Sequence, residues 1–383
     1  MSITADPVKL LAELVAIDSV NPGLAPGAAG ETAIVAMLRE RLDRSGFSTR
    51  VVTPADHPDR PSLLAWRHST TGRTILLNGH LDTVGVDQMS APFEPRIDGH
   101  RMYGRGAADM KGGIAGLVVA AEQIARDDVG GVILALVADE EDASLGTETA
   151  LAHLAETRLR PDVAVVGEPT ALDRTVSLRG FAVVEVEMKG RAAHSSMPAQ
   201  GVNAVAHLGR LLTAVEQADA ALQGGGSLLA TVAAGGQARF SLAASSRATL
   251  ERRITPAEEG VEQAVADVEQ ILDRLRKDDP TFSARARLVV GRDAWRLDDT
   301  GPAAEFADRL DNALRDAPGR TGAPLSAPYW MEAPLFASAG IPAVICGPSG
   351  GGLHAVDEWV DLRQVRTYAA GLVAAFREYP CSR

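Results

Sequence analysis

Residues 74–82 read TILLNGHLD, an apolar run that ends in an imidazole and a carboxylate. Three further apolar runs follow along the chain, VILALVA at 132–138, VAVV at 163–166 and AVIC at 343–346. Runs as apolar as these are typical of strands buried on both faces, which occur in parallel sheets covered by helices. The pattern therefore predicts an α/β fold built on a mostly parallel sheet.

Helical periodicity alternates with these runs. Apolar residues recur every three or four positions in Glu31–Arg44, Ile114–Arg126 and Ala303–Leu314, as they do on the buried side of a helix. A sheet whose strands are buried on both faces needs a cover on both sides. We therefore expect helices on both faces of the sheet.

The pattern changes after Asp173. Polar and apolar residues then alternate in segments such as 181–190 and 247–254, with a helix-like stretch at about 203–221 between them. Strands of period two beside a helix are typical of an α+β domain. A chain of 383 residues also exceeds what one core comfortably supports. We therefore predict a two-part catalytic domain interrupted by an α+β insertion, with the boundaries 1–174, 175–290 and 291–383.

The composition excludes several classes of protein. With 46% hydrophobic and 23% charged residues, the chain is close to the globular average. Its 38 Lys+Arg against 50 Asp+Glu give a net charge of −12, which opposes nonspecific binding to nucleic acid or to a membrane surface. No run approaches the roughly 18 apolar residues of a membrane span. Cys346 and Cys381 are too few for a disulfide framework, and the N-terminus lacks the basic start of a secretory signal, so we expect a cytoplasmic protein.

An imidazole or a carboxylate follows each apolar run. In open α/β sheets, ligands bind outside the carboxyl ends of the strands, so these side chains should meet in one crevice. Asp109, in the loop GRGAADMKGG before the helix at 114–126, is expected at the same edge. The other side chains are His80, Asp82, Asp139, Glu140, Glu141, Glu168 and His354.

These residue types predict a metal site. Imidazoles with carboxylates suit Zn²⁺ or Co²⁺, and four or five protein ligands exceed what one tetrahedral zinc requires, so we expect two ions. Asp109 is the candidate for a carboxylate that bridges such a pair. Of the neighbours Glu140 and Glu141, one would bind metal while the other takes a proton from water. Asp82 is expected to hydrogen-bond the ring nitrogen of His80 that faces away from the metal.

Six segments, taken together, resemble a known family. They are NGHLDTV, GRGAADMKGG, ADEEDASLGT, GEPT, GRAAHSSMPAQGVNAV and HAVDEWV, in that order along the chain. They are similar to the di-zinc amidohydrolase family of acetylornithine deacetylase, succinyl-diaminopimelate desuccinylase, aminoacylase and glutamate carboxypeptidase. The resemblance covers essentially the whole chain and implies a zinc-exopeptidase-like fold. It implies two divalent ions, zinc before cobalt, with Glu140 as general base and with the metal ligands His80, Asp109 (bridging), Glu141, Glu168 and His354.

The resemblance also implies a substrate and a partner. The substrate would be an N-acyl amino acid or small peptide with a free carboxylate, cleaved at its amide bond. By this resemblance the insertion would be a lid domain through which the chain forms a homodimer. His194 matches the lid histidine that stabilises the oxyanion in the active site of the partner subunit. Asn203 and Arg253 match positions that contact substrate, and a guanidinium suits a carboxylate. Whether Arg252 or Arg253 has this role is open from the sequence.

Two other functions stay open at this point. Gly347-x-Ser349-x-Gly351 fits the nucleophile-elbow pattern of serine hydrolases, although no helix is expected after it. The second alternative is a family relative that binds metal without catalysis. The presence of Glu140 disfavours it, because a pure binding site has no use for a base that binds no metal. The acyl group and the amino acid are not specified by the sequence, and Glu332 stands where relatives often carry Asp.

Overall fold

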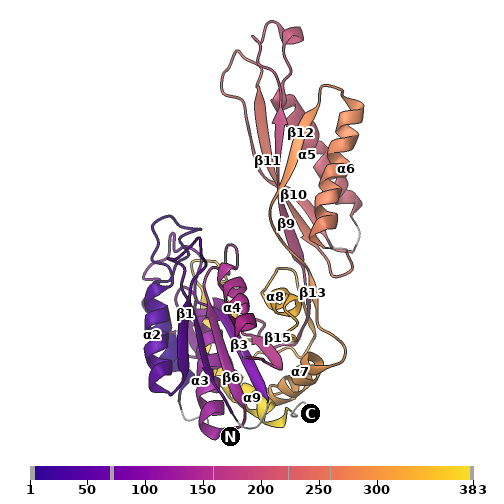
Figure 1. Ribbon diagram of the computed structural model, residues 1–383. Helices are drawn as coiled ribbons and strands as arrows, with labels where there is room; N and C mark the ends of the chain where they lie inside the picture. Colours follow the sequence, from indigo (N-terminus) through magenta and orange to yellow (C-terminus); the bar gives the residue numbers. More distant parts are fainter. Residues whose placement is uncertain (1–4, 70–72, 158, 223, 259, 380–383) are drawn as a thin grey trace. The chain divides into compact units, whose positions relative to one another are not determined.

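The computed structural model describes residues 5–69, 73–157, 159–222, 224–258 and 260–379, so that Cys381 lies outside the described residues (Figure 1). The described chain divides into two compact units. Unit 1 comprises the chain up to Val176, Leu297–Leu325 and the segment from Met331 onward; unit 2 comprises Ser177–Arg296 and Ser326–Trp330.

Unit 1 is built on a six-stranded mixed sheet. Its central strands β6, β3, β7 and β15 pair in parallel, whereas β1 and β2 join one edge in antiparallel fashion. In sheet order the strands are β1 (Ser48–Val52), β2 (Ser62–Arg67), β6 (Gly131–Val137), β3 (Thr74–His80), β7 (Val163–Val166) and β15 (Ala343–Ile345). The predicted α/β fold is thus confirmed, with an antiparallel extension at one edge.

Helices cover this sheet. Every residue of β6 and β7 is buried, which explains why these strands carry no polar alternation. Helix α3 packs against β3 and β6, and α4 packs against β2 and β6. The helices of unit 1 are α1 (Pro7–Val15), α2 (Thr32–Arg44), α3 (Gly112–Asp127), α4 (Leu145–Glu156), α7 (Pro302–Ala313), α8 (Ala333–Ser338) and α9 (Leu362–Glu378). The three predicted helices correspond to α2, α3 and α7.

Glycines allow α3 to lie close to its neighbours. A Cβ on Gly113 would lie 2.1 Å from the main-chain oxygen of Gly167, the residue before Glu168. A Cβ on Gly116 would lie 2.6 Å from the ring of Tyr368 in α9. Contacts this short exclude any side chain, so the start of α3 rests directly on the segment that follows β7.

A second, small antiparallel sheet in unit 1 carries two loops of the site. Its order is β16-β17-β5-β4, and β5 pairs with β17 so that Met102 lies opposite Val360. Arg101 lies 4.0 Å from the centroid of the Trp359 ring across this pair, a contact that favours the pairing. The strands are β4 (Arg96–Asp98), β5 (Arg101–Tyr103), β16 (Gly350–Gly351) and β17 (Trp359–Asp361). The chain leaves β5 toward Asp109 and connects β16 to β17 through His354.

Unit 2 is an α+β unit with a four-stranded antiparallel sheet. Alternate residues of β9 and β11 are buried, and Val184, Val186 and Met188 pack with Leu211 and Leu272 from the two helices. This alternation is the period of two seen in the sequence. The elements are β10 (Ser227–Gly235), β11 (Ser245–Ile254), β9 (Gly180–Lys189) and β12 (Ser283–Arg292) in sheet order, with α5 (Ala204–Ala221) and α6 (Val261–Asp278).

Shorter elements complete the chain. The strands β8 (Thr175–Leu178), β13 (Trp295–Arg296) and β14 (Leu325–Ala327) form a three-stranded sheet. A single turn of helix occurs at Pro198–Gln200. The segment Ala107–Lys111 also turns, but Asp109 and Met110 within it have non-helical backbone angles. Within the residues that the structure describes, every helix is too short or too polar to cross a membrane.

Candidate metal centre

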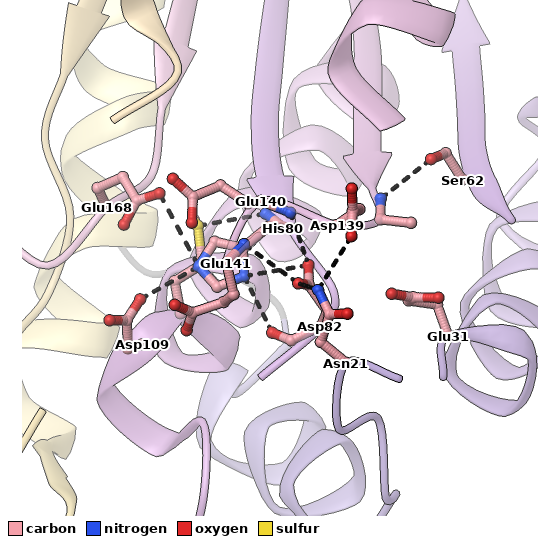
Figure 2. A network of polar contacts seen from close by, with 12 residues as sticks. Asn21, Glu31, Ser62, His80, Asp82, Asp109, Asp139, Glu140, Glu141 and Glu168 are labelled. Carbon is pink, nitrogen blue, oxygen red and sulfur yellow. Dashed lines mark hydrogen bonds and ion pairs between the residues drawn. The ribbon is translucent and has the colours of Figure 1, made fainter. Parts of the chain in front are cut away.

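The side chains predicted to bind metal converge in unit 1. Figure 2 shows four of them, His80, Asp109, Glu141 and Glu168. His80 ends β3, Glu141 follows β6, and Glu168 follows β7. The possible ligand atoms form two groups, each lying within 4.8 Å of one another: His80, Asp109 and Glu168 in the first, and Asp109, Glu141 and His354 in the second. Asp109 belongs to both groups, so the two groups of possible ligand atoms share one carboxylate.

The two oxygens of Asp109 face different histidines. Oδ1 lies 3.1 Å from Nε2 of His80, and Oδ2 lies 3.4 Å from Nε2 of His354. His80 Nε2 is also 3.9 Å from Oε1 of Glu168, and His354 Nε2 is 3.2 Å from Oε2 of Glu141. A carboxylate placed this way can join two ions with one oxygen on each.

The two histidines differ in their access to solvent. The side chain of His80 is 1% exposed, whereas that of His354 is 53% exposed. His80 stands on a buried strand of the central sheet, and His354 stands on a loop with a left-handed backbone, φ +59°. The two groups of ligand atoms are therefore unequal, one deep and one at the surface.

Carboxylates outnumber imidazoles in this cluster. Oε1 of Glu141 and Oε1 of Glu168 are buried and have no hydrogen-bond partner among the described residues. Burial raises the pKa of Glu168 well above its usual value, and the Asp109 charge raises it further. Burial and the Glu168 charge do the same to the pKa of Glu140. Bare buried oxygens are costly unless a cation meets them, so the donor set fits divalent metal ions.

The imidazoles respond to the same charge. Hydrogen bonds with Asp109 and Glu141 raise the pKa of His354 to about 10. Burial acts against protonation of His80, yet Asp109 and Asp82 hold the pKa of this ring well above its usual value. The neighbouring carboxylates thus favour the protonated form of both rings. Metal ions would displace these protons, as expected where imidazoles are ligands.

Asp82 holds the turn that follows β6. Its Oδ1 accepts from the main-chain N–H of Glu140 at 3.1 Å, and its Oδ2 accepts from that of Glu141 at 3.2 Å. Nδ1 of His80 lies 3.0 Å from the main-chain oxygen of Asp82 and 3.6 Å from its carboxylate. The expected contact between this ring and Asp82 therefore occurs mainly through the main chain, and the carboxylate orients the two glutamates instead.

A buried network that the sequence analysis did not identify supports Asp82. Asn21 Nδ2 donates to Asp82 at 2.8 Å and to Asp139 at 3.1 Å. Arg60 lies 2.7 Å from Asp139 and 2.6 Å from Glu31. We call these five residues, Asn21, Glu31, Arg60, Asp82 and Asp139, the Arg60 network; each is at most 5% exposed. Asp139 has a φ of +68°, so the network fixes an unusual turn directly before Glu140.

Two of the predicted lid residues have local partners in unit 2. His194 is exposed, and its Nδ1 lies 2.8 Å from the hydroxyl of Ser196. Asn203 is the N-cap of α5, where its side-chain oxygen accepts from the N–H of Val205 at 3.1 Å. The cap gives Asn203 a structural role in the helix in addition to any contact with substrate.

The adjacent arginines of β11 point to opposite faces. Arg252 is 2% exposed and forms ion pairs with Glu258 and Asp267 inside unit 2. The side chain of Arg253 is 32% exposed and lies 2.5 Å from Glu251. Arg253 is therefore the more exposed arginine of this pair, as expected from the pleat of a strand.

The segment after Ser349 does not form a nucleophile elbow. Strand β16 follows it directly, where that motif requires a helix. The main-chain N–H of Ser349 donates to Gln364 at 2.9 Å. The geometry therefore gives no support to a serine nucleophile here.

The comparisons with known proteins agree with this site. Residues 76–378 match the sequence model of Peptidase family M20/M25/M40. The chain belongs to this family. A succinyl-diaminopimelate desuccinylase of Sphingopyxis alaskensis is 29% identical over 388 residues, covering 97% of both chains. This M20 chain is thus a hydrolase that acts on amide bonds, in a metal-dependent family.

Solved structures show the same fold. A tripeptidase from Staphylococcus aureus has a TM-score of 0.78 at 18% identity, over 97% of both chains. A protein from Bacillus subtilis, described as a dinuclear metal binding peptidase of the M20 family, has a TM-score of 0.72 at 13% identity, over 98% of both chains. The fold inferred from the sequence is therefore that of M20 peptidases.

Proposed function

We propose that this M20 enzyme hydrolyses the amide bond of an N-acyl amino acid or small peptide with a free carboxylate, using two divalent metal ions, zinc or else cobalt. The observation that carries the proposal is the position of Asp109, one oxygen toward His80 and the other toward His354. His80, Asp109 and Glu168 would hold one ion, and Asp109, Glu141 and His354 the other. Bound there, the ions would polarise the scissile carbonyl and lower the pKa of water.

Glu140 is the proposed general base. It lies next to Glu141, yet it belongs to neither group of possible ligand atoms. Its main-chain N–H is fixed by Asp82, and its raised pKa brings the carboxyl closer to the range in which it can both take and return a proton. In the proposed reaction Glu140 removes a proton from the attacking water and then delivers it to the leaving nitrogen.

Unit 2 would supply the remaining parts of the site. We infer a homodimer formed through unit 2, in which His194 stabilises the oxyanion in the partner's site and Arg253, with Asn203, binds the substrate carboxylate. The exposure of His194 and Arg253 supports these roles. The desuccinylases among the relatives support a substrate with carboxylates. The cytoplasmic location stays a prediction of the sequence.

Turnover of a small panel of N-acyl amino acids and dipeptides, measured with zinc or cobalt supplied, tests the proposal. Glu140→Ala should lower turnover by about 10²–10⁴-fold while both ions stay bound, because general-base catalysis has that magnitude. Ser349→Ala is the matched control and should keep full turnover, whereas a chelator should abolish it. Turnover that survives the chelator, or that Ser349→Ala removes, would contradict the proposal.

A further inference from the structure

A buried carboxylate outside the candidate site binds the loop that carries Asp109. Glu358 is 1% exposed. Its Oε1 accepts from the main-chain N–H groups of Ala108 at 2.9 Å and Asp109 at 3.0 Å. Its Oε2 accepts from the N–H of Gly106 at 2.9 Å and from Nη1 of Arg105 at 2.7 Å. Both oxygens are thus engaged by the same short loop, and one bond goes to Asp109 itself.

Glu358 also belongs to the loop that carries His354. Both residues lie between β16 and β17, so the side-chain contacts of Glu358 join the His354 loop to the Asp109 loop. The main-chain oxygen of Glu358 adds a bond from the N–H of Gly104 at 3.2 Å. The pairing of β17 with β5 continues this contact in the adjacent sheet. Glu358 is therefore the point at which two segments bearing possible metal ligands are held together.

The bonds of Glu358 set the position of Asp109 relative to His354. The three main-chain N–H groups and the guanidinium all point at one carboxylate, and such charge-assisted bonds are short and directional. Without the Glu358 carboxylate, the loop from Arg105 to Asp109 would lose these bonds. The 3.4 Å approach of Asp109 to His354 would then have no support from this side.

We propose that Glu358 is a positioning residue for the metal pair, above all for the ion that Asp109, Glu141 and His354 would hold. This inference rests on the proposed function, since it presupposes that those side chains bind metal. Glu358 itself touches none of the possible ligand atoms and acts through the main chain of the Asp109 loop. Residues that orient ligands in this way typically change metal affinity by about 10–100-fold when they are replaced.

The chain offers a matched control. Glu122 is also a buried carboxylate of unit 1, 8% exposed, and it accepts from Arg41 at 2.8 and 2.9 Å and from Ser45 at 2.9 Å. It stands in α3, and its bonds go to α2 and the residue that follows it rather than to a loop with metal ligands. Glu122→Gln therefore removes a less buried ion pair of the same kind without changing a loop that carries possible ligands.

The experiment is a calorimetric titration of the metal-free full chain with Zn²⁺ and with Co²⁺, alongside thermal unfolding. Wild type should bind two ions per chain. Glu358→Gln should weaken binding at one of the two sites by about 10–100-fold, because an amide NH₂ would face two of the four donors. Glu122→Gln should lower the melting temperature by less than Glu358→Gln does and leave both affinities unchanged.

Glu358→Asp keeps the charge but is one methylene shorter, so it should restore part of the affinity that Glu358→Gln loses. Should Glu358→Gln fail to fold, Arg105→Lys is used instead, which removes the fork and keeps the main-chain bonds; a smaller loss of affinity at the same site is expected. Unchanged affinities in these variants, or losses equal to that of Glu122→Gln, would overturn the inference. Wild type that binds fewer than two ions would overturn the proposed function instead.

Discussion

Unit 1 contains two neighbouring groups of buried carboxylates (Figure 2), which differ in the partners of their oxygens. In the Arg60 network, Arg60 pairs with both Glu31 and Asp139, and the oxygens of Asp82 meet N–H donors. In the metal centre, Glu141 and Glu168 each keep a buried oxygen without a partner among the described residues. The carboxylates of the Arg60 network have their partners within the protein. In the metal centre, buried oxygens are left that a cation would meet. The two groups therefore differ in whether the protein itself supplies partners for their carboxylate oxygens.

Replacing Arg60, the cation of the Arg60 network, should have the largest effect on stability. Arg60→Met leaves Glu31 and Asp139 buried without their counter-charge, and the loss of one partner of a buried ion pair typically costs about 3–5 kcal/mol. The free energy of unfolding, measured by urea denaturation of the metal-free protein, should fall by this amount. Arg366→Met is the control, because its pair with Asp6 is about half exposed on both sides and should cost about 0–1 kcal/mol. Equal effects of the two variants would contradict the comparison.

A smaller effect should appear as a dependence of stability on pH. Glu332 is 1% exposed, and burial raises its pKa to about 7. A raised pKa favours the folded state below the unfolded value of 4.5, and this contribution disappears as the pH rises to about 7.

The metal-free protein should therefore lose roughly 2–3 kcal/mol of stability from this group between those pH values. Unfolding free energies at pH 4.5, 6 and 8 measure the slope. Glu332→Gln removes the titrating proton and should flatten the profile. A variant as steep as wild type would show that other groups cause the dependence.

The smallest effect should have the opposite sign. Glu168→Gln removes a charge that burial and Asp109 disfavour, so the metal-free protein should become more stable at pH 8, by about 1 kcal/mol. The same substitution should weaken metal binding, because a ligand is lost. Thermal unfolding with and without zinc separates the two effects. Destabilisation of the metal-free variant would mean that Glu168 is already satisfied without a cation.

Most of the metal centre could be predicted because its residues follow apolar strands. The run of β3 ends at His80 and the run of β7 leads to Glu168, and strand ends in a parallel sheet meet at one edge. The antiparallel strand β2 was missed, although SLLAWR at 62–67 is apolar. Helix α6 was also missed, although its apolar residues have helical spacing. In both cases the sequence contains the pattern from which the element could have been predicted.

The Arg60 network could not be predicted from the sequence. Glu31 is the N-cap of α2, and Asn21 and Arg60 lie in irregular segments, so no periodicity brings them together. Their contacts depend on the path of loops between elements. The left-handed backbone of Asp139 is likewise a result of tertiary contacts, because few residues other than glycine adopt it without support. The contacts of Glu358 could not be predicted either, because they also depend on the path of loops.

The unequal exposure of the two histidines has a consequence for how the enzyme would be regulated. In the proposed site, metal ions would exchange with the solution on the side of His354, whose side chain is 53% exposed. The side chain of His80 is only 1% exposed. Occupancy at the outer position would then follow the concentration of free metal around the enzyme. Catalytic capacity would rise and fall with metal supply without any change in the amount of protein.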